Sequence, residues 1–385
     1  MTIWALPENI EDVLPAEALK LERMRRAALD LFAAHGYELV MPPLLEYVES
    51  LLSGVGHDMD LATFKLVDQL SGRMMGLRAD TTPQVARIDA HVLNRKGVTR
   101  LCYAGSVLHT RPSGLGKSRQ PFQVGAELYG HAGLDADIEV QQLMLDTLAD
   151  VGVKAAKLDI GHSEIFRALV DAANVSADER EALFAAVTAK DVPLLQTLAD
   201  QHGGTIAGLA ALPSLYGDGH ESVIARARKI LPAGGRITRA LDELERIARH
   251  FAAQGIVVSV DLSELGGFDY ESGIAFAAYA EGAADAVARG GRYDDVGRVF
   301  GRARPATGFS MDLKALLPLV PDATVVVSPV LAPQHPDAAA RKVMKQLRAA
   351  GEVVITRLDN APVECDRELK MIDGQWQVVS TKHKA

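Results

Sequence analysis

The segment RQPFQVGAELYG, residues 119–130, alternates between polar and apolar residues. Alternate residues of a β-strand face the same side, and one side here is apolar, with Phe122, Val124, Ala126 and Leu128. The other side carries Gln123, Gly125, Glu127 and Tyr129. Two polar side chains that flank a glycine leave room for a small polar ligand on the sheet. The alternative is a half-exposed strand whose polar side chains face water.

Asp80 precedes a predicted helix start in the segment LRADTTPQVAR. Pro83 suits the first turn of a helix, and an acid at this point lies near the positive end of the helix dipole. Asp80 is therefore placed to accept hydrogen bonds from an ammonium group, and equally to act as an ordinary capping carboxylate. Val85, Ile88 and Val92 are expected to form the buried side of this helix.

The segment RPSGLGKS invites comparison with a phosphate-binding loop, but its pattern and its context differ. Arg111 stands where that loop has its first glycine, and the segment joins two predicted strands without opening a helix. We interpret it as a mobile basic loop that carries Arg111, Lys117 and Arg119.

The segment ARGGRYDDVGRVF combines two glycines with two acids. Gly290-Gly291 indicates a tight turn or a close approach of backbone to a ligand. Asp294-Asp295 has the oxygen ligands that Mg²⁺ prefers, although adjacent acids in a turn are more often solvated. No HExxH motif or nucleophile elbow is present, and we predict no metal site, no cofactor and no catalytic residue.

The elements that position these residues form a helix-covered, mainly antiparallel sheet. A helix follows Pro15, with Met24, Ala28, Leu31 and Phe32 at helical spacing. Strands are predicted at YELVMPP (37–43), RLCYAGSVL (100–108), FQVGAELYG (122–130), IVVSVDL (256–262), GIAFAAYA (273–280) and ADAVARGG (284–291). RPATGFSMDLKALL (304–317) is expected to be a helix with one side formed by Phe309, Leu313, Leu316 and Leu317.

Two further regions differ in texture from this sheet. Ala-rich helical segments from about residue 153 to 235 indicate a helical insertion. From residue 318 a short α/β domain is predicted, with strands at 324–330 and 352–358, a helix at 337–351 and a hairpin that turns at Asp373-Gly374. The fold class is α+β, with a larger domain over residues 1–317 and a smaller one over 318–385.

Composition favours a soluble cytoplasmic protein. The 385 residues include two distant cysteines, which argues against a disulfide framework and a cysteine-based zinc site. The N-terminal segment is acidic, unlike a signal peptide, and no apolar run approaches the ~20 residues that span a bilayer. The net charge of −9 offers no footprint for a polyanion such as tRNA.

In chain order, these segments resemble a class II aminoacyl-tRNA synthetase, specifically histidyl-tRNA synthetase. GYELVMPPLLEYVE is similar to the first class II motif, which builds a homodimer interface in that family. SVLHTRPSGLGKSRQPFQVGAELYG is similar to the second motif and RPATGFSMDLKALL to the third. LRADTTPQ, GGFDYES and GGRYD are similar to segments that the family uses to bind its amino acid. The resemblance covers most of residues 1–317.

The resemblance implies a histidine-binding pocket made of Asp80, Thr82, Arg111, Gln123, Glu127, Tyr270, Gly290 and Gly291. Asp80 and Thr82 would receive the α-ammonium group, and Gln123 and Glu127 the ammonium or the imidazole. Tyr270 and the glycine pair would lie against the ring. Arg111 matches the later arginine of the second motif.

The departures from the family pattern concern catalysis. Leu108 and Thr110 stand where the second motif has its arginine and glutamate, and Ala315 replaces the arginine of the third. In the histidine signature, Gly266 replaces an arginine and Glu271 a tyrosine. Such cations stabilise charge on a reacting triphosphate, and losing one donor typically costs about 10²–10³ in rate. Aminoacylation is therefore expected to be lost.

This profile is similar to that of a paralogous family, the regulatory subunits of ATP phosphoribosyltransferase. The resemblance implies a non-catalytic chain that assembles with a short-form catalytic subunit, confers feedback regulation by L-histidine and, with its short C-terminal domain, binds no tRNA. Two alternatives remain open: a divergent active histidyl-tRNA synthetase, or a synthetase-like protein that binds tRNA or another effector.

Overall fold

The computed structural model describes residues 4–52, 57–114, 117–202, 206–265, 272–321, 328–358 and 365–380. The chain divides into two compact units, Met1–Pro321 and Asp322–Ala385. In the described ranges, no helix combines the length and the apolar character that a membrane crossing requires.

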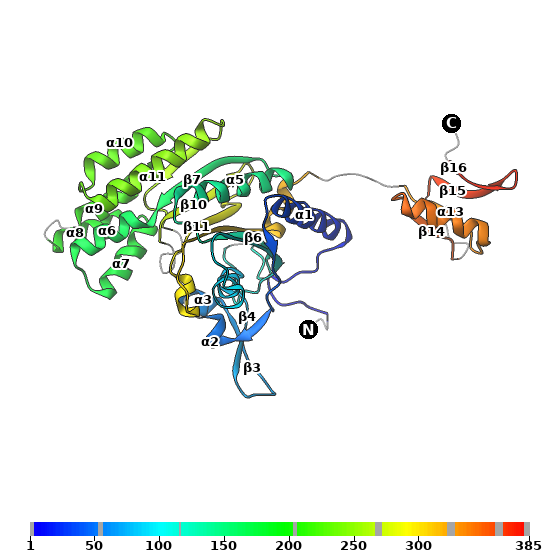
Figure 1. The fold of residues 1–385 in the computed structure, drawn as a ribbon, viewed down its shortest axis with the longest axis horizontal. Coiled ribbons are helices and arrows are strands. Elements are labelled where there is room, and N and C mark those ends of the chain that lie inside the picture. The colour runs from blue at the N-terminus through cyan, green and yellow to red at the C-terminus, as the bar shows by residue number, and fades with distance from the viewer. Residues whose placement is uncertain are drawn as a thin grey trace. The chain divides into compact units, whose positions relative to one another are not determined.

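The larger unit is built on a nine-stranded sheet with the order β1-β5-β6-β12-β11-β10-β7-β9-β8 (Figure 1). The strands are β1 (Glu38–Leu39), β5 (Thr99–Ser106), β6 (Phe122–Tyr129), β7 (Ala155–His162), β8 (Tyr216–Gly217), β9 (Val258–Asp261), β10 (Ile274–Ala280), β11 (Ala288–Arg292) and β12 (Ala306–Asp312). The pairs β1–β5 and β7–β9 are parallel and the other pairs are antiparallel. The predicted mainly antiparallel sheet is therefore confirmed.

Two long helices, α1 (Pro15–Ala34) and α5 (Leu134–Asp150), cover one face of this sheet. Met24, Ala28 and Phe32 of α1 are buried in the same core as the apolar side of β6, as their spacing predicts. Because these helices fill one face with apolar side chains, the polar side of β6 faces away from the main core.

The opposite face carries a smaller layer. α4 (Thr82–Arg87) continues into the π-helix η1 (Ile88–Leu93), and a small sheet β2-β4-β3 joins Leu45–Tyr47, Met74–Leu77 and Phe64–Val67. The other short elements are α2 (Val48–Leu51), α3 (His57–Ala62) and η3 (Val296–Phe300). Val85 is buried as predicted, but Val92 is 60% exposed. A π-turn shifts the helical register, so Asp89 and Ala90 are buried instead.

The helical insertion begins later than predicted and ends later too. Residues 155–162 form β7, whose Leu158 and Ile160 are buried in the sheet. The helices that follow are α6 (Ser163–Ala173), α7 (Ala177–Thr188), α8 (Val192–Gln201), α9 (Ala207–Ala211), η2 (Leu212–Ser214), α10 (His220–Ile230) and α11 (Gly235–Ala252). Figure 1 shows α6–α11 gathered beyond β7 and β10.

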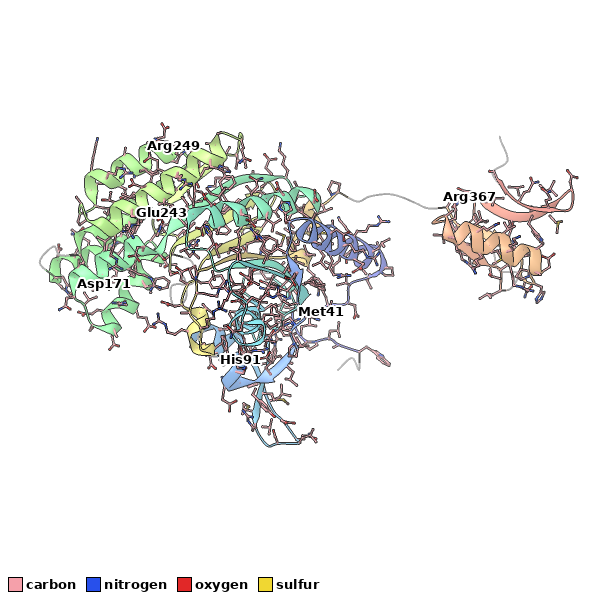
Figure 2. All side chains as sticks on the ribbon, viewed as in Figure 1. Met41, His91, Asp171, Glu243, Arg249 and Arg367 are labelled. Carbon is pink, nitrogen blue, oxygen red and sulfur yellow. The ribbon has the colours of Figure 1, made fainter. Side chains whose placement is uncertain are left out.

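A hydrogen bond ties this insertion to the sheet. His162, at the end of β7, lies 3.0 Å from Glu243 of α11, which is labelled in Figure 2. Glu243 keeps a lowered pKa mainly because of this bond. The insertion is thereby held at the strand that borders β10.

The third class II motif was wrongly predicted as a helix. Residues 306–312 form β12, and only Leu313–Leu316 form a short helix, α12, followed by the 3₁₀ turn η4 (Leu317–Leu319). Phe309 and Met311 are both buried, at the period of two that a strand requires. Phe309 also lies at helical spacing from Leu313 and the leucines that follow it, and this longer helical pattern hid the short strand pattern.

In its described ranges, residues 328–358 and 365–380, the smaller unit has a four-stranded sheet, β14-β13-β15-β16, and one helix. These elements are β13 (Val330–Ala332), α13 (Ala338–Ala349), β14 (Val354–Thr356), β15 (Arg367–Ile372) and β16 (Gln375–Ser380). The predicted hairpin is confirmed: Asp373 and Gly374 have φ angles of 46° and 76°, as a type I′ turn requires. Most of the strand predicted at 324–330 lies outside the described residues.

Candidate functional site

The polar side of β6 opens onto a cavity of about 360 Å³. Its floor is a row of four residues in register across four strands: Glu127, Gly308, Gly291 and Ala275. A Cβ atom at Gly308 would collide with the Glu127 carboxyl group. The small residues therefore leave a flat surface of backbone, on which a planar group of a ligand can lie.

Glu127 closes one end of this floor and is only 1% exposed. The Thr82 hydroxyl donates to its carboxyl group at 3.1 Å and the Tyr103 hydroxyl at 3.2 Å. The Tyr293 hydroxyl donates to the other carboxyl oxygen. Three hydroxyl groups from α4, β5 and the end of β11 thus replace the water that a carboxyl group normally requires.

The burial of Glu127 changes its protonation. Desolvation raises the pKa of its carboxyl group to about 8, and the nearby charge of Asp80 adds to the increase. The hydrogen bonds from Tyr293, Thr82 and Tyr103 lower this pKa, but by less than desolvation raises it. Glu127 is therefore mostly neutral at pH 7. A cationic ligand would favour the ionised form, so binding of an ammonium or imidazolium group is coupled to release of this proton.

Asp80 also lines the cavity, just before the start of α4, and like Glu127 it accepts a hydrogen bond from Thr82. Its Oδ1 atom accepts hydrogen bonds from the Thr82 backbone amide at 3.1 Å and from Gln123 Nε2 at 2.6 Å. Gln123 also accepts a bond from the Thr81 amide at 3.0 Å. The N-cap residue of α4 is Thr81, so the expectation that Asp80 is an ordinary capping carboxylate is wrong. Asp80 precedes the cap, bonds to the Thr82 amide and lines the cavity, as the ligand interpretation requires.

The structure brings most of the predicted pocket residues together. Those that line the cavity are Asp80, Thr82, Glu127, Gly290 and Gly291. Gln123 does not line this cavity itself, but it donates a hydrogen bond to Asp80, which does. Arg111 is exposed on the loop after β5 and is not among the residues that line the cavity. Tyr270 lies outside the described residues.

The glycine pair does not adopt the tight turn that was one of its two predicted conformations. Gly290 and Gly291 lie within strand β11 and do not form a turn. A Cβ atom at Gly290 would contact the Phe276 ring in the core, whereas Gly291 belongs to the cavity floor. The alternative of a close backbone approach remains compatible with this geometry.

Several residues that line the cavity were missed by the sequence analysis. They are Glu264, Ala275, Phe276, Arg289, Tyr293, Gly308, Phe309 and Ser310. Arg289 and Tyr293 alternate with Gly291 on β11, so period-two spacing was a signal for them. Gly308 could not be found in the same way because its segment was taken for a helix.

A second cavity of about 580 Å³ adjoins the first and shares Asp80, Arg289 and Ser310 with it. Ala315, which replaces an arginine of the synthetase pattern, lines this cavity. Lys117 also lines it and lies 3.1 Å from Asp285. The segment that carries Lys117 joins β5 to β6 and opens no helix, so a phosphate-binding loop is excluded there.

The two acids after the glycine pair are held by neighbouring groups. Asp294 accepts hydrogen bonds from Arg292 at 3.3 Å and from the Ala306 amide at 3.1 Å. Asp295 pairs with Arg298 at 2.5 Å. Among the described residues, no group of three His, Cys, Asp or Glu side chains is arranged to hold a metal ion.

Comparison with known proteins places this geometry in a class. A family model described as histidyl-tRNA synthetase matches residues 9–316, which include the whole nine-stranded sheet and all the residues that line the first cavity. The predicted α+β, class II synthetase-like fold is thereby confirmed. A second model, described as the ATP phosphoribosyltransferase subunit HisZ C-terminal domain, matches residues 327–379.

Individual relatives distinguish between families within this class of proteins. An ATP phosphoribosyltransferase regulatory subunit of Janthinobacterium sp. (strain Marseille) is 56% identical, with 98% of each chain covered. One of Ralstonia nicotianae is 54% identical over 100% of each chain. The crystal structure of an ATP phosphoribosyltransferase regulatory subunit/histidyl-tRNA synthetase from Bacillus halodurans C has a TM-score of 0.81 at 26% identity and covers 94% of this chain and 95% of its own. The chain belongs to the ATP phosphoribosyltransferase regulatory subunit family.

Replacing Glu127 by glutamine should change how stability depends on pH. Between the ordinary pKa of 4.5 and the native value of about 8, folded wild-type protein holds a proton that the unfolded chain releases. Wild-type stability therefore falls by up to about 1.4 kcal/mol per pH unit across this window from this group alone. Glu127→Gln lacks this loss.

The free energy of unfolding of Glu127→Gln relative to wild type should increase from about pH 5 to about pH 8 and then level off. Urea unfolding at several pH values measures this difference. Glu181→Gln, at an exposed position of α7, serves as the control and should give a flat difference. Parallel profiles for Glu127→Gln and wild type would contradict the assignment.

Proposed function

We propose that this chain is the non-catalytic regulatory subunit of an ATP phosphoribosyltransferase, the complex that performs the first step of histidine biosynthesis. Full-length similarity to proteins of that name, including the C-terminal unit, supports the assignment. A short-form catalytic subunit supplies the phosphoribosyl-transfer chemistry, and this chain supplies feedback control.

The proposed feedback ligand is L-histidine, bound in the first cavity. The observation that carries this proposal is the acidic lining around a flat floor: Asp80, Glu127 and Glu264 line a cavity of about 360 Å³. Acids select a ligand with an ammonium or imidazolium group, and the row of small residues accepts a planar ring. The ammonium group binds at Asp80 and Thr82, and the ring lies toward Glu127.

Histidine in this cavity shifts the complex toward an inhibited state. Such coupling is reciprocal, and it typically amounts to about 1–3 kcal/mol. The ligand must therefore bind more tightly to the inhibited assembly than to the active one.

Aminoacylation is proposed to be lost, because the cations that the reaction requires are replaced. Ala315 lines the second cavity in place of an arginine, and Leu108 and Gly266 replace two more. Lys117 already lies beside Asp285. The presence of one helix in the part of the smaller unit that the structure describes, together with the net charge of −9, supports the further proposal that the chain binds no tRNA.

The first class II motif is proposed to form a homodimer interface. Four of its apolar side chains are exposed in the single chain: Leu39, Met41, Leu44 and Leu45. Met41, labelled in Figure 2, is 77% exposed. An interface with a second copy would remove these side chains from water.

Asp80→Ala should weaken feedback inhibition by histidine while the complex still assembles. Removing a charged hydrogen-bond partner of the ligand should raise the histidine concentration for half-inhibition by about 10- to 100-fold. The measurement is inhibition of the reconstituted complex, with co-purification as the check on assembly. Asp135→Ala on α5, a side chain that is 75% exposed, is the matched control. Unchanged inhibition of the Asp80 variant would refute the pocket.

The purified chain should show no histidine-dependent exchange of pyrophosphate into ATP. Each missing cation lowers such a rate by about 10²–10³, although losses within one site are not additive. A histidyl-tRNA synthetase assayed in parallel provides the positive control. Robust exchange by this chain would restore the enzyme as the better assignment.

Met41→Asp should convert the homodimer to monomers. A charge buried without a partner costs at least about 3 kcal/mol, which weakens association about 100-fold or more. Sedimentation velocity measures the change. Met371→Asp, which places the same charge on the smaller unit at a position 47% exposed, should leave the dimer intact. A Met41→Asp protein that remains dimeric would exclude this segment as the interface.

A further inference from the structure

Arg289 stands beside the cavity floor on strand β11. It alternates with Gly291, so its side chain projects from the same face of the sheet. In the register it pairs with Ser310 of β12, one row away from the pair Gly291 and Gly308. Arg289 and Ser310 line both cavities, and Arg289 therefore lies where the two adjoin.

The ionisable groups that line the first cavity are mostly acids, and a cationic ligand would favour the ionised form of Glu127. Asp80, Glu127 and Glu264 are acids, and among the described residues that line it, Arg289 is the only lysine or arginine. A free amino acid carries a carboxylate as well as an ammonium group. A buried carboxylate requires a cation, and the arginine of the synthetase pattern at this site is replaced by Gly266.

The Arg289 side chain is available for such a partner. Its Nη1 atom lies 3.4 Å from Glu264, and the two side chains are 55% and 33% exposed. An ion pair this long and this exposed contributes little, so a ligand carboxylate can compete for the guanidinium. The guanidinium group also matches a carboxylate in shape and can donate two parallel hydrogen bonds.

The separation of the charged groups suits a small zwitterion. β11 is two strands away from β6, and Arg289 lies two residues along the sheet from the row of Glu127. Strand spacings of about 4.8 Å and a rise of about 3.4 Å per residue place the two Cα atoms about 12 Å apart. Both residues project from the same face of the sheet, and the cavity that they line, of about 360 Å³, has room for one amino acid between them.

We propose that Arg289 binds the carboxylate of the amino-acid ligand at the junction of the two cavities and makes the pocket selective for a free amino acid over the corresponding amine. This inference rests on the proposed histidine pocket. Arg289 of β11 would supply the carboxylate anchor that a glycine at position 266 cannot offer. The anchor also neutralises the carboxylate that a synthetase would use as a nucleophile.

Calorimetric titration of the full chain with L-histidine and with histamine, which lacks the carboxylate, tests the proposal. Wild type should bind histidine more tightly than histamine. Arg289→Ala should weaken histidine binding by about 10- to 100-fold, as expected for a lost hydrogen bond to a charged group. It should leave histamine binding unchanged. Arg289→Lys should retain part of the difference, and Arg298→Ala, at a side chain 72% exposed, is the control.

Two results would overturn the inference and leave the pocket in place. One is equal histidine affinity of wild type and Arg289→Ala. The other is an equal loss of histidine and histamine in that variant, which would indicate a structural role for the arginine. A different result, wild-type protein that takes up no histidine, would overturn the proposed pocket itself, and this inference with it.

Discussion

The buried carboxyl group of Glu127 is the constraint on which the site depends. A carboxyl group that is 1% exposed requires partners, and Thr82, Tyr103 and Tyr293 supply them from three separate elements. These hydroxyl groups meet only if α4 docks on the sheet and β5, β6 and β11 keep their register. The cavity of the larger unit therefore forms only when all of these elements are in place. The contacts that satisfy Glu127 also define where a ligand would lie.

The sequence predicted the part of this arrangement that is local. Alternation along residues 122–129 placed Gln123 and Glu127 on one side of a strand, and the period of two is a property of the strand itself. Gly308 lies in the same row as Glu127 through pairing between strands far apart in the chain. No local period encodes that register, so the floor of the cavity became visible only in the structure. Arg289, by contrast, alternates with Gly291 on one strand, so a local signal for it was present and was not used.

The errors in element type also have local causes. In residues 306–312, Phe309 and Met311 were the only large apolar residues, which gave too short a pattern for a strand to outweigh the apolar residues that follow it. Residues 155–162 were assigned to the Ala-rich insertion because composition was averaged across the change from strand to helix. Val92 became exposed because a π-turn breaks the helical period. In each case one local rule was applied across a boundary between two types of backbone structure.

The two cavities explain how a synthetase fold can serve regulation. A catalyst must bind the transition state more tightly than the substrate, and cations aimed at the triphosphate provide that difference. A sensor needs only tight binding of the ground state, together with unequal affinity for two states of its complex. The first cavity keeps its acids and its flat floor, whereas Ala315 in the second cavity contributes no charge. Under the proposed function, the replacement of an arginine by Ala315 in the second cavity lowers reactivity toward a triphosphate and leaves the acids that line the first cavity in place.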